Sequence, residues 1–136
     1  MKKLYLDANV VLDYILKRSP FDVAPKELFA MAEDNRVQLL VSSLIFTLVH
    51  YITSKQIGKV AATRELAGIF RLVTTVAVDE QIIGQAIQAG LPDFEDTVQL
   101  FAALAAGADA IVTRDPKGFP TPLVPVLNPV VALAQL

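Results

Sequence analysis

The chain has 136 residues, of which 54% are apolar and 19% charged, and its formal net charge is −2. That length suits one domain over residues 1–136, the apolar content excludes a disordered chain, and the charge gives no overall basic surface for nucleic acid, although a local patch would suffice. With no cysteine and one histidine, the chain can form neither disulfides nor thiolate or all-histidine metal sites.

The N-terminal stretch MKKLYLDANVVLDYIL is basic and then apolar, in the manner of a signal peptide. Asp7, Asn9 and Asp13 interrupt its apolar run, however, and no small-residue cleavage site follows. No segment reaches the ~18 uninterrupted apolar residues that a membrane span needs. We therefore expect a cytoplasmic protein with no membrane partner.

Short apolar runs then alternate with segments of helical periodicity. The expected strands are residues 3–6, 37–42, 72–78, 109–113 and 123–127. The expected helices are residues 9–18, 26–35, 44–56, 60–71, 80–89 and 94–106, and a last short helix after Asn128. Pro20 and Pro25 bracket a break between the first two helices, and Pro125 confines the last strand to a sheet edge. The alternation predicts an α/β fold in which a parallel sheet carries helices on both faces.

Polar residues and glycines mark the expected ends of these helices. The candidate caps are Ser42 or Ser43, Asp79, Asp93 and Asn128, and the candidate stops are Gly58, Gly90 and Gly107.

Acidic residues gather where the predicted topology would bind a ligand, beyond the carboxyl ends of the strands. Asp7 follows the first strand and Asp115 follows the fourth. The helix that Asp93 opens carries Asp96 in its first turn and leads into the fourth strand, so a right-handed crossover places its start at the same edge. We expect Asp7, Asp96 and Asp115 to share one rim of the sheet.

Carboxylates ~4–6 Å apart repel each other, and at least one pKa rises unless a cation lies between them. Oxygen ligands suit Mg²⁺ or Mn²⁺. Such an ion can activate a water molecule and stabilise charge on a phosphate. The acids therefore indicate metal-assisted phosphodiester hydrolysis.

Each of these acids also has a purely structural interpretation. For Asp7, capping of the following helix is as good an explanation as metal binding. For Asp93 capping is favoured, and with Asp96 it resembles a capping box. Asp115 precedes Pro116 and suits a turn. These interpretations hold singly, but they do not explain why the acids converge on one rim.

The neighbouring polar residues are assigned more weakly. Asp13 is expected to be a supporting or surface acid, Glu95 to be solvated, and His50 to be a core or partly buried histidine. Thr113 can bind a carboxylate or a ligand water. Arg114 and Lys117 can contact phosphates or belong to a solvated loop.

The segments LYLDANVVLDYIL, DFEDTVQLFAALAAGADAIVTRD and PKGF resemble the PIN domain family, and most of all its bacterial branch of VapC-type toxin ribonucleases. The resemblance implies a three-layer α/β/α sandwich that binds Mg²⁺ or Mn²⁺ through acidic residues and cleaves single-stranded RNA. Asp7, Asp96 and Asp115 match the family's catalytic and metal-binding acids, while Asn9 and Thr113 match polar residues beside them. Many such proteins are toxins with a cognate antitoxin, and many are homodimers.

The chain departs from the family pattern at one position. The family usually has a glutamate in the helix after the second strand, where this chain has Leu48. Thr47 and His50 flank that position without replacing a carboxylate. Asp93, which can face the same rim as Asp96, is the candidate fourth metal ligand.

Two functions from different classes follow. The leading one is a Mg²⁺- or Mn²⁺-dependent endoribonuclease, the toxin of a type II toxin–antitoxin pair. The alternative, motivated by Leu48 and the weak net charge, is a catalytically degenerate PIN-like module that binds RNA or protein. In addition, the apolar residues of 44–52 and 60–73 exceed the needs of one small core and indicate a homodimer interface.

Overall fold

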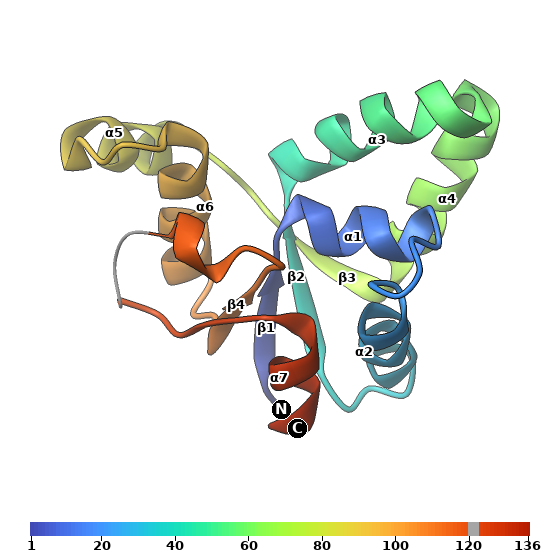
Figure 1. Ribbon diagram of the computed structural model, residues 1–136. Coiled ribbons are helices and arrows are strands. Elements are labelled where there is room, and N and C mark those ends of the chain that lie inside the picture. Colours follow the sequence, from blue (N-terminus) through green and yellow to red (C-terminus); the bar gives the residue numbers. More distant parts are fainter. Residues whose placement is uncertain (120–122) are drawn as a thin grey trace.

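The computed structural model describes residues 1–119 and 123–136 and places a parallel sheet between two layers of helices (Figure 1). The strands are β1 (Lys3–Leu6), β2 (Gln38–Ser42), β3 (Val73–Val76), β4 (Ala110–Val112) and β5 (Val126–Leu127). They lie in the order β3-β2-β1-β4-β5, and every neighbouring pair is parallel. The predicted α/β class with a parallel sheet is confirmed.

Helices connect the strands and cover both faces of the sheet. They are α1 (Ala8–Ile15), α2 (Val23–Glu33), α3 (Ser43–Ile57), α4 (Lys59–Leu72), α5 (Glu80–Ala89), α6 (Phe94–Ala105) and α7 (Pro129–Ala134), with a short 3-10 helix η1 (Pro116–Gly118). Within the part of the chain that the structure describes, none of these helices has the length and apolarity needed to cross a bilayer.

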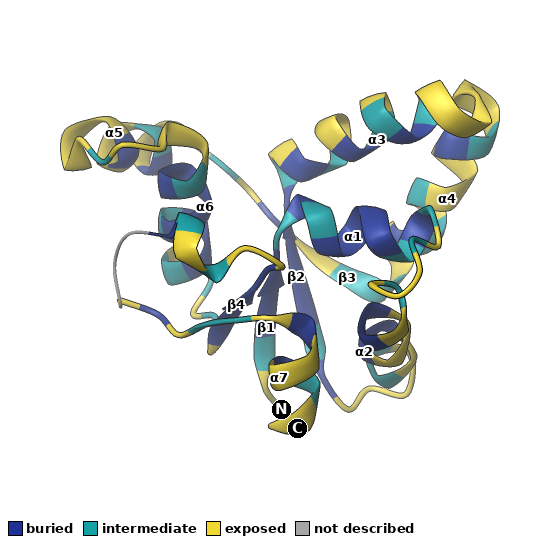
Figure 2. Ribbon diagram, viewed as in Figure 1, coloured by how far each residue is buried: buried dark blue, intermediate teal, exposed yellow. Residues whose placement is uncertain are grey.

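The alternation of side chains along the central strands assigns them to the two layers. In β1, Leu4 and Leu6 join the core formed with α1, α2, α3, α4 and α7, whereas Tyr5 joins the core formed with α5 and α6. In β4, Val112 joins the first of these cores and Ile111 joins the second. Both faces of β1 and β4 are therefore buried (Figure 2), which explains why these strands read as continuous apolar runs in the sequence.

The predicted helix boundaries hold where a polar residue caps the helix. The Ser42 hydroxyl accepts a hydrogen bond of 3.0 Å from the Leu44 N–H and so caps α3, while the Ser43 hydroxyl accepts one of 3.2 Å from the Val78 N–H. Asp79, Asp93 and Asn128 cap α5, α6 and α7. The glycines after α3, α5 and α6 have φ of +87°, +62° and +68°, as their role in ending helices requires.

Several boundaries differ from the prediction: α1 ends at Ile15 and not at residue 18, β3 covers Val73–Val76 and not residues 72–78, and two further differences involve prolines. Pro25 does not mark a break but lies in the first turn of α2, where the missing N–H costs nothing because it has no helical partner. The last strand is shorter than predicted, since β5 includes only Val126 and Leu127. Within residues 1–119 and 123–136 it pairs with β4 alone and is an edge strand, as Pro125 led us to expect.

Candidate functional site

The site is built where β1 and β4 end side by side. Leu6 pairs with Val112, and the Asp7 N–H donates a hydrogen bond of 3.0 Å to the Val112 carbonyl, which continues the pairing by one residue. Asp7 and Thr113 therefore leave the sheet as neighbours. The first turn of α6, which carries Asp96, supplies the third segment of the rim.

Asp7 both caps α1 and faces the rim. One carboxylate oxygen accepts a hydrogen bond of 2.8 Å from the Ala8 N–H, and the other accepts one of 2.9 Å from the Thr113 hydroxyl. Burial raises the pKa of Asp7, these two hydrogen bonds lower it, and the charges of Asp115 and Asp93 raise it further. Capping and a place in an acidic cluster are thus compatible for this residue.

Asp96 and Asp115 face the same small space beside Gly118. A Cβ atom on Gly118 would lie 2.9 Å from Asp96 Oδ2 and 3.3 Å from Asp115 Oδ2. Partial burial, followed by the charges of Asp93, Asp7, Glu95 and Asp115, raises the pKa of Asp96 to about 6. The two carboxylates therefore border the same space, on the side of Gly118 where a side chain would lie.

Asp93 caps α6, which is the structural role that the sequence favoured for it. Its Oδ1 accepts a hydrogen bond of 2.9 Å from the Asp96 N–H, and its carbonyl accepts one of 2.6 Å from the Thr97 hydroxyl. Over residues 1–119 and 123–136, no return bond joins the Asp96 carboxylate to the Asp93 N–H, so only half of the capping box forms. The Asp96 carboxylate is thereby left to the rim, while exposed Glu95 is solvated, as predicted.

Of the four predicted metal ligands, Asp96 and Asp115 border a common gap. Across the described ranges, no three acidic or histidine side chains form a group that could hold a metal ion. Mg²⁺ is commonly bound by one or two carboxylates, with water filling the remaining positions of its octahedron. The gap that a Gly118 Cβ would fill, bordered by Asp96 and Asp115, suits that kind of binding.

Thr113 ties Asp7 to the turn that carries Asp115. Its completely buried hydroxyl donates to Asp7 Oδ2 and accepts hydrogen bonds of 3.1 Å from the Asp115 N–H and 3.2 Å from Asn9 Nδ2. Asn9 Oδ1 in turn accepts one of 3.2 Å from the Arg114 N–H. The expectation that Thr113 binds a carboxylate is confirmed, and Asn9 supports the same turn.

Asp13 is not a surface acid, because its side chain is fully buried. Arg114 binds it through two hydrogen bonds, Nε to Oδ2 at 2.6 Å and Nη2 to Oδ1 at 3.1 Å, and Arg18 Nη1 lies 3.6 Å from Oδ1. The Arg114 guanidinium also stacks 4.2 Å from the centre of the Phe21 ring. Arg114 therefore anchors the Asp115 turn to α1, a role that the sequence did not indicate.

A second buried polar contact fixes α6 against the sheet. The Tyr5 hydroxyl donates to Gln99 Oε1, and both side chains are buried. Gln99 lies one helical turn after Asp96, so the contact fixes the height of Asp96 over β1. The sequence signal for this contact was Gln99, a polar residue on the otherwise apolar face of α6.

Leu48 lines an apolar hollow of about 290 Å³ between α3 and α6. The other residues of the hollow are Leu44, Ile45, Ile83, Phe94, Glu95, Val98 and Gln99. His50, two residues further along α3, is partly buried and shares a hydrogen bond of 2.9 Å with Thr63 on α4. His50 thus joins α3 to α4, and the prediction of a partly buried histidine is confirmed.

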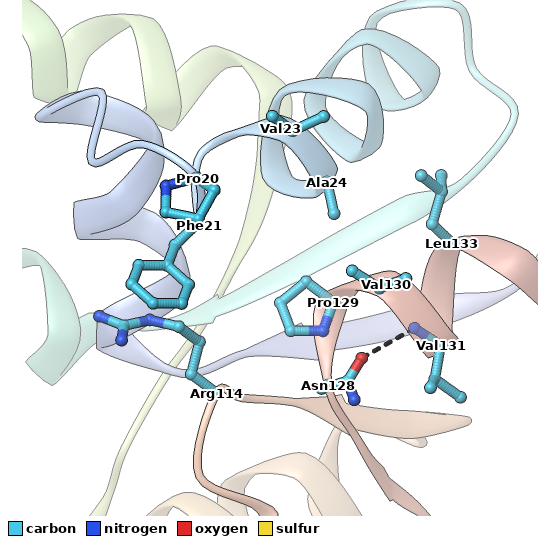
Figure 3. Close-up of a pocket in the computed structure, with 10 residues that line it drawn as sticks. All are labelled: Pro20, Phe21, Val23, Ala24, Arg114, Asn128, Pro129, Val130, Val131 and Leu133. Atoms are coloured by element: carbon cyan, nitrogen blue, oxygen red, sulfur yellow. Dashed lines mark hydrogen bonds between the residues drawn. The ribbon is translucent and has the colours of Figure 1, made fainter.

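A larger hollow, of about 660 Å³, lies between the start of α2 and α7 (Figure 3). Its walls are almost wholly apolar, and none of the rim acids lines it. Arg114 is its one charged residue, and Figure 3 shows the guanidinium turned toward the Phe21 ring. The candidate metal ligands therefore lie outside this hollow.

Comparison with known proteins agrees with this architecture. Residues 3–117 match the PIN domain family. Ribonuclease VapC1 of Aquifex aeolicus (strain VF5) is 27% identical over 132 residues, which cover 93% of this chain and 90% of that protein.

Solved structures share the fold at low sequence identity. DNA-bound VapBC from Salmonella typhimurium superposes with a TM-score of 0.72 and 18% identity, covering 95% of this chain and 99% of that one. A toxin–antitoxin complex from Klebsiella pneumoniae gives 0.68 and 18%, covering 93% and 97%. The family match extends over most of the chain and includes both strands that form the rim. The chain belongs to the PIN domain family.

Proposed function

We propose that the protein is a metal-dependent endoribonuclease that cleaves single-stranded RNA and acts as the toxin of a type II toxin–antitoxin pair. The observation that carries the proposal is the meeting of Asp96 and Asp115 beside Gly118, with Asp7 linked to the same turn through Thr113. The sequence relative from Aquifex aeolicus is a ribonuclease, which supports the same chemistry.

Asp96 and Asp115 would hold a Mg²⁺ or Mn²⁺ ion, with Asp7 and Asp93 at its border. When bound, the ion would lower the pKa of a water molecule and neutralise charge on the scissile phosphate. Asp7 is held in one orientation by Ala8 and Thr113, so its carboxylate can position that water. Lys117, exposed in η1 two residues after Asp115, can contact the RNA backbone.

The catalytically degenerate alternative is less favoured. Leu48 removes one carboxylate, yet the acids carried by β1, α6 and the β4 turn are all present. Calorimetry with Mn²⁺ separates the two hypotheses: binding that is lost in Asp96→Asn supports the enzyme. If no heat of binding is detected at millimolar metal, while RNA or an antitoxin still binds, the result supports the degenerate module.

The proposed partners are an antitoxin protein and a second copy of the chain, and the proposed compartment is the cytoplasm. The antitoxin is supported by the structural neighbour solved as a toxin–antitoxin complex. The second copy is supported by exposed apolar side chains on α3 and α4.

The test of catalysis is cleavage of an end-labelled single-stranded RNA in the presence of Mg²⁺ or Mn²⁺. We expect Asp7→Asn to reduce the rate roughly 100-fold or more, because the carboxylate that positions the water loses its charge. The matched control is Asp34→Asn. Asp34 is exposed after α2, toward the opposite edge of the sheet, and lies 3.7 Å from Arg36 in a surface ion pair that contributes little. Equal activity in wild type and Asp7→Asn would rule out the assignment.

A further inference from the structure

Gly118 is the last residue of η1 and lies beside the carboxylates of Asp96 and Asp115. We infer that Gly118 sets the width of the gap between Asp96 and Asp115 and thereby controls how well that pair accommodates a divalent cation. This inference rests on the proposed metal-dependent function and adds a residue to its site.

The glycine is distinguished by what a side chain would meet. The chain has six glycines, and for five of them a Cβ atom would find nothing within 4 Å among the residues that the structure describes. At Gly118 it would lie 2.9 Å from Asp96 Oδ2, below the 3.0 Å that real Cβ contacts essentially never breach, and 3.3 Å from Asp115 Oδ2. Only here does the absence of a side chain leave room for two carboxylates.

The backbone at this position gives no other reason for glycine. The glycines with positive φ are Gly58, Gly90 and Gly107, and Gly118 is not among them. An alanine there would adopt the same backbone conformation without strain. Glycine is therefore required here for space and not for its backbone conformation.

The turn cannot simply move away from the acids to make room. The Gly118 N–H donates a hydrogen bond of 3.1 Å to the Asp115 carbonyl, and the Asp115 N–H is bound to the buried Thr113 hydroxyl. On the other side, Phe119 is buried in the core under α5 and α6. A methyl group at residue 118 would therefore displace the flexible end of Asp96 and leave the turn where it is.

That displacement has a chemical consequence. Carboxylates that share a cation must keep their oxygens at fixed positions around its octahedron, and Mg²⁺ tolerates little departure from that geometry. Moving Asp96 away from Asp115 would weaken the ion's protein ligands and fill space that its bound water needs. The fold would remain intact because no buried contact is lost.

The experiment measures Mn²⁺ binding by calorimetry and the metal-free melting temperature of four proteins. They are the wild type, Gly118→Ala, Gly84→Ala and Asp96→Asn. Gly84 is the matched control, since it is exposed on α5 and its Cβ would meet nothing within 4 Å. We expect Gly118→Ala to weaken Mn²⁺ binding roughly tenfold or more, as changes beside metal ligands do, with its metal-free melting temperature at or slightly above that of the wild type. Gly84→Ala should bind Mn²⁺ as the wild type does.

The outcomes separate this inference from the proposed function. If the wild type binds Mn²⁺, Asp96→Asn does not, and Gly118→Ala matches the wild type, the inference is overturned while the metal site stands. A large loss of metal-free stability in Gly118→Ala would also overturn it, because glycine would then serve the fold. No Mn²⁺ binding by the wild type would overturn the proposed metal chemistry and this inference together.

Discussion

At the scale of single residues, Asp7 and Asp96 lie where the ionised form of a carboxylate is unfavourable. Burial is the largest cause of the raised pKa of both Asp7 and Asp96, and the neighbouring acids add to it in each case. A cluster of carboxylates without a cation disfavours its own ionised form. Removing a proton from the folded protein is therefore harder than removing it from the unfolded chain.

This charge predicts how stability depends on pH when metal is absent. The pKa of Asp96 rises from 3.8 in the unfolded chain to about 6 in the folded protein, so the folded state binds more protons within that window. The contribution of Asp96 to stability is fully present at low pH and is lost as pH rises through about 6. Because Asp96 is partly exposed, solvent screening limits the effect to a fall of a few degrees in melting temperature.

The measurement is a series of thermal melts in a chelator between pH 5 and pH 8. Mn²⁺ should remove most of the decline, since a bound cation favours the ionised carboxylates, and its affinity should weaken below about pH 6 as protons compete. Asp96→Asn should flatten the decline without metal. A stability that rises steadily from pH 5 to pH 8 would contradict this account.

At the scale of elements, the Asp115 turn is held from two directions. Thr113 binds it to β1 through Asp7, and Arg114 binds it to α1 through Asp13. The second anchor is an ion pair with an uneven distribution of burial. The Asp13 side chain is fully buried, whereas a third of the Arg114 side chain is exposed.

That asymmetry predicts different costs for removing the two partners. Arg114→Ala leaves the buried Asp13 carboxylate with the more distant Arg18, 3.6 Å away, and we expect it to lower the free energy of unfolding by about 3 kcal/mol. Asp13→Asn leaves a guanidinium that water can reach, and we expect a loss of about 1–2 kcal/mol. Urea titrations of the two variants check the order. Equal losses, or a larger loss for Asp13→Asn, would show that the buried, unpaired carboxylate is not the main cause of the lost stability.

The elements themselves were largely predictable from the sequence, because capping residues and apolar periodicity act locally. Asp79 and Asn128 begin helices for reasons contained within four residues. The convergence of acids at the carboxyl edge followed from the handedness of the crossover, which is a rule of topology. The meeting of Arg114 with Asp13, 101 positions away, depends on the depth at which α1 packs and could not be read from spacing. The nearness of Gly118 to Asp96 has the same origin, as it depends on the path of a turn in three dimensions.

At the scale of the whole molecule, α3 and α4 extend from the sheet as an adjacent pair (Figure 1). His50 and Thr63 join them by a hydrogen bond, and Phe46 meets Phe70 edge to face at 6.0 Å. Exposed apolar side chains nevertheless remain on both helices: Leu44, Leu48, Tyr51, Ile57, Val60 and Phe70. Apolar area of this kind on a small protein favours association over solvation.

We predict that the wild type is a homodimer and that charge on this helical pair dissociates it. The test compares the wild type with the double variant Tyr51→Glu, Val60→Glu by light scattering at micromolar concentration. Tyr51 and Val60 are 59% and 76% exposed, so the monomer loses little packing, and an acid near the start of α4 is favoured by the helix dipole.

The matched control is Val130→Lys on α7, which is 69% exposed and lies away from the α3–α4 pair (Figure 1). A standard interface buries ~800 Å² per partner, and two buried carboxylates at its centre would each face a large desolvation cost. The double variant should therefore have the mass of one chain, and the control that of two. A wild type that scatters as a monomer would remove the dimer from the proposal, and a dimer that survives in the double variant would place its interface on another surface.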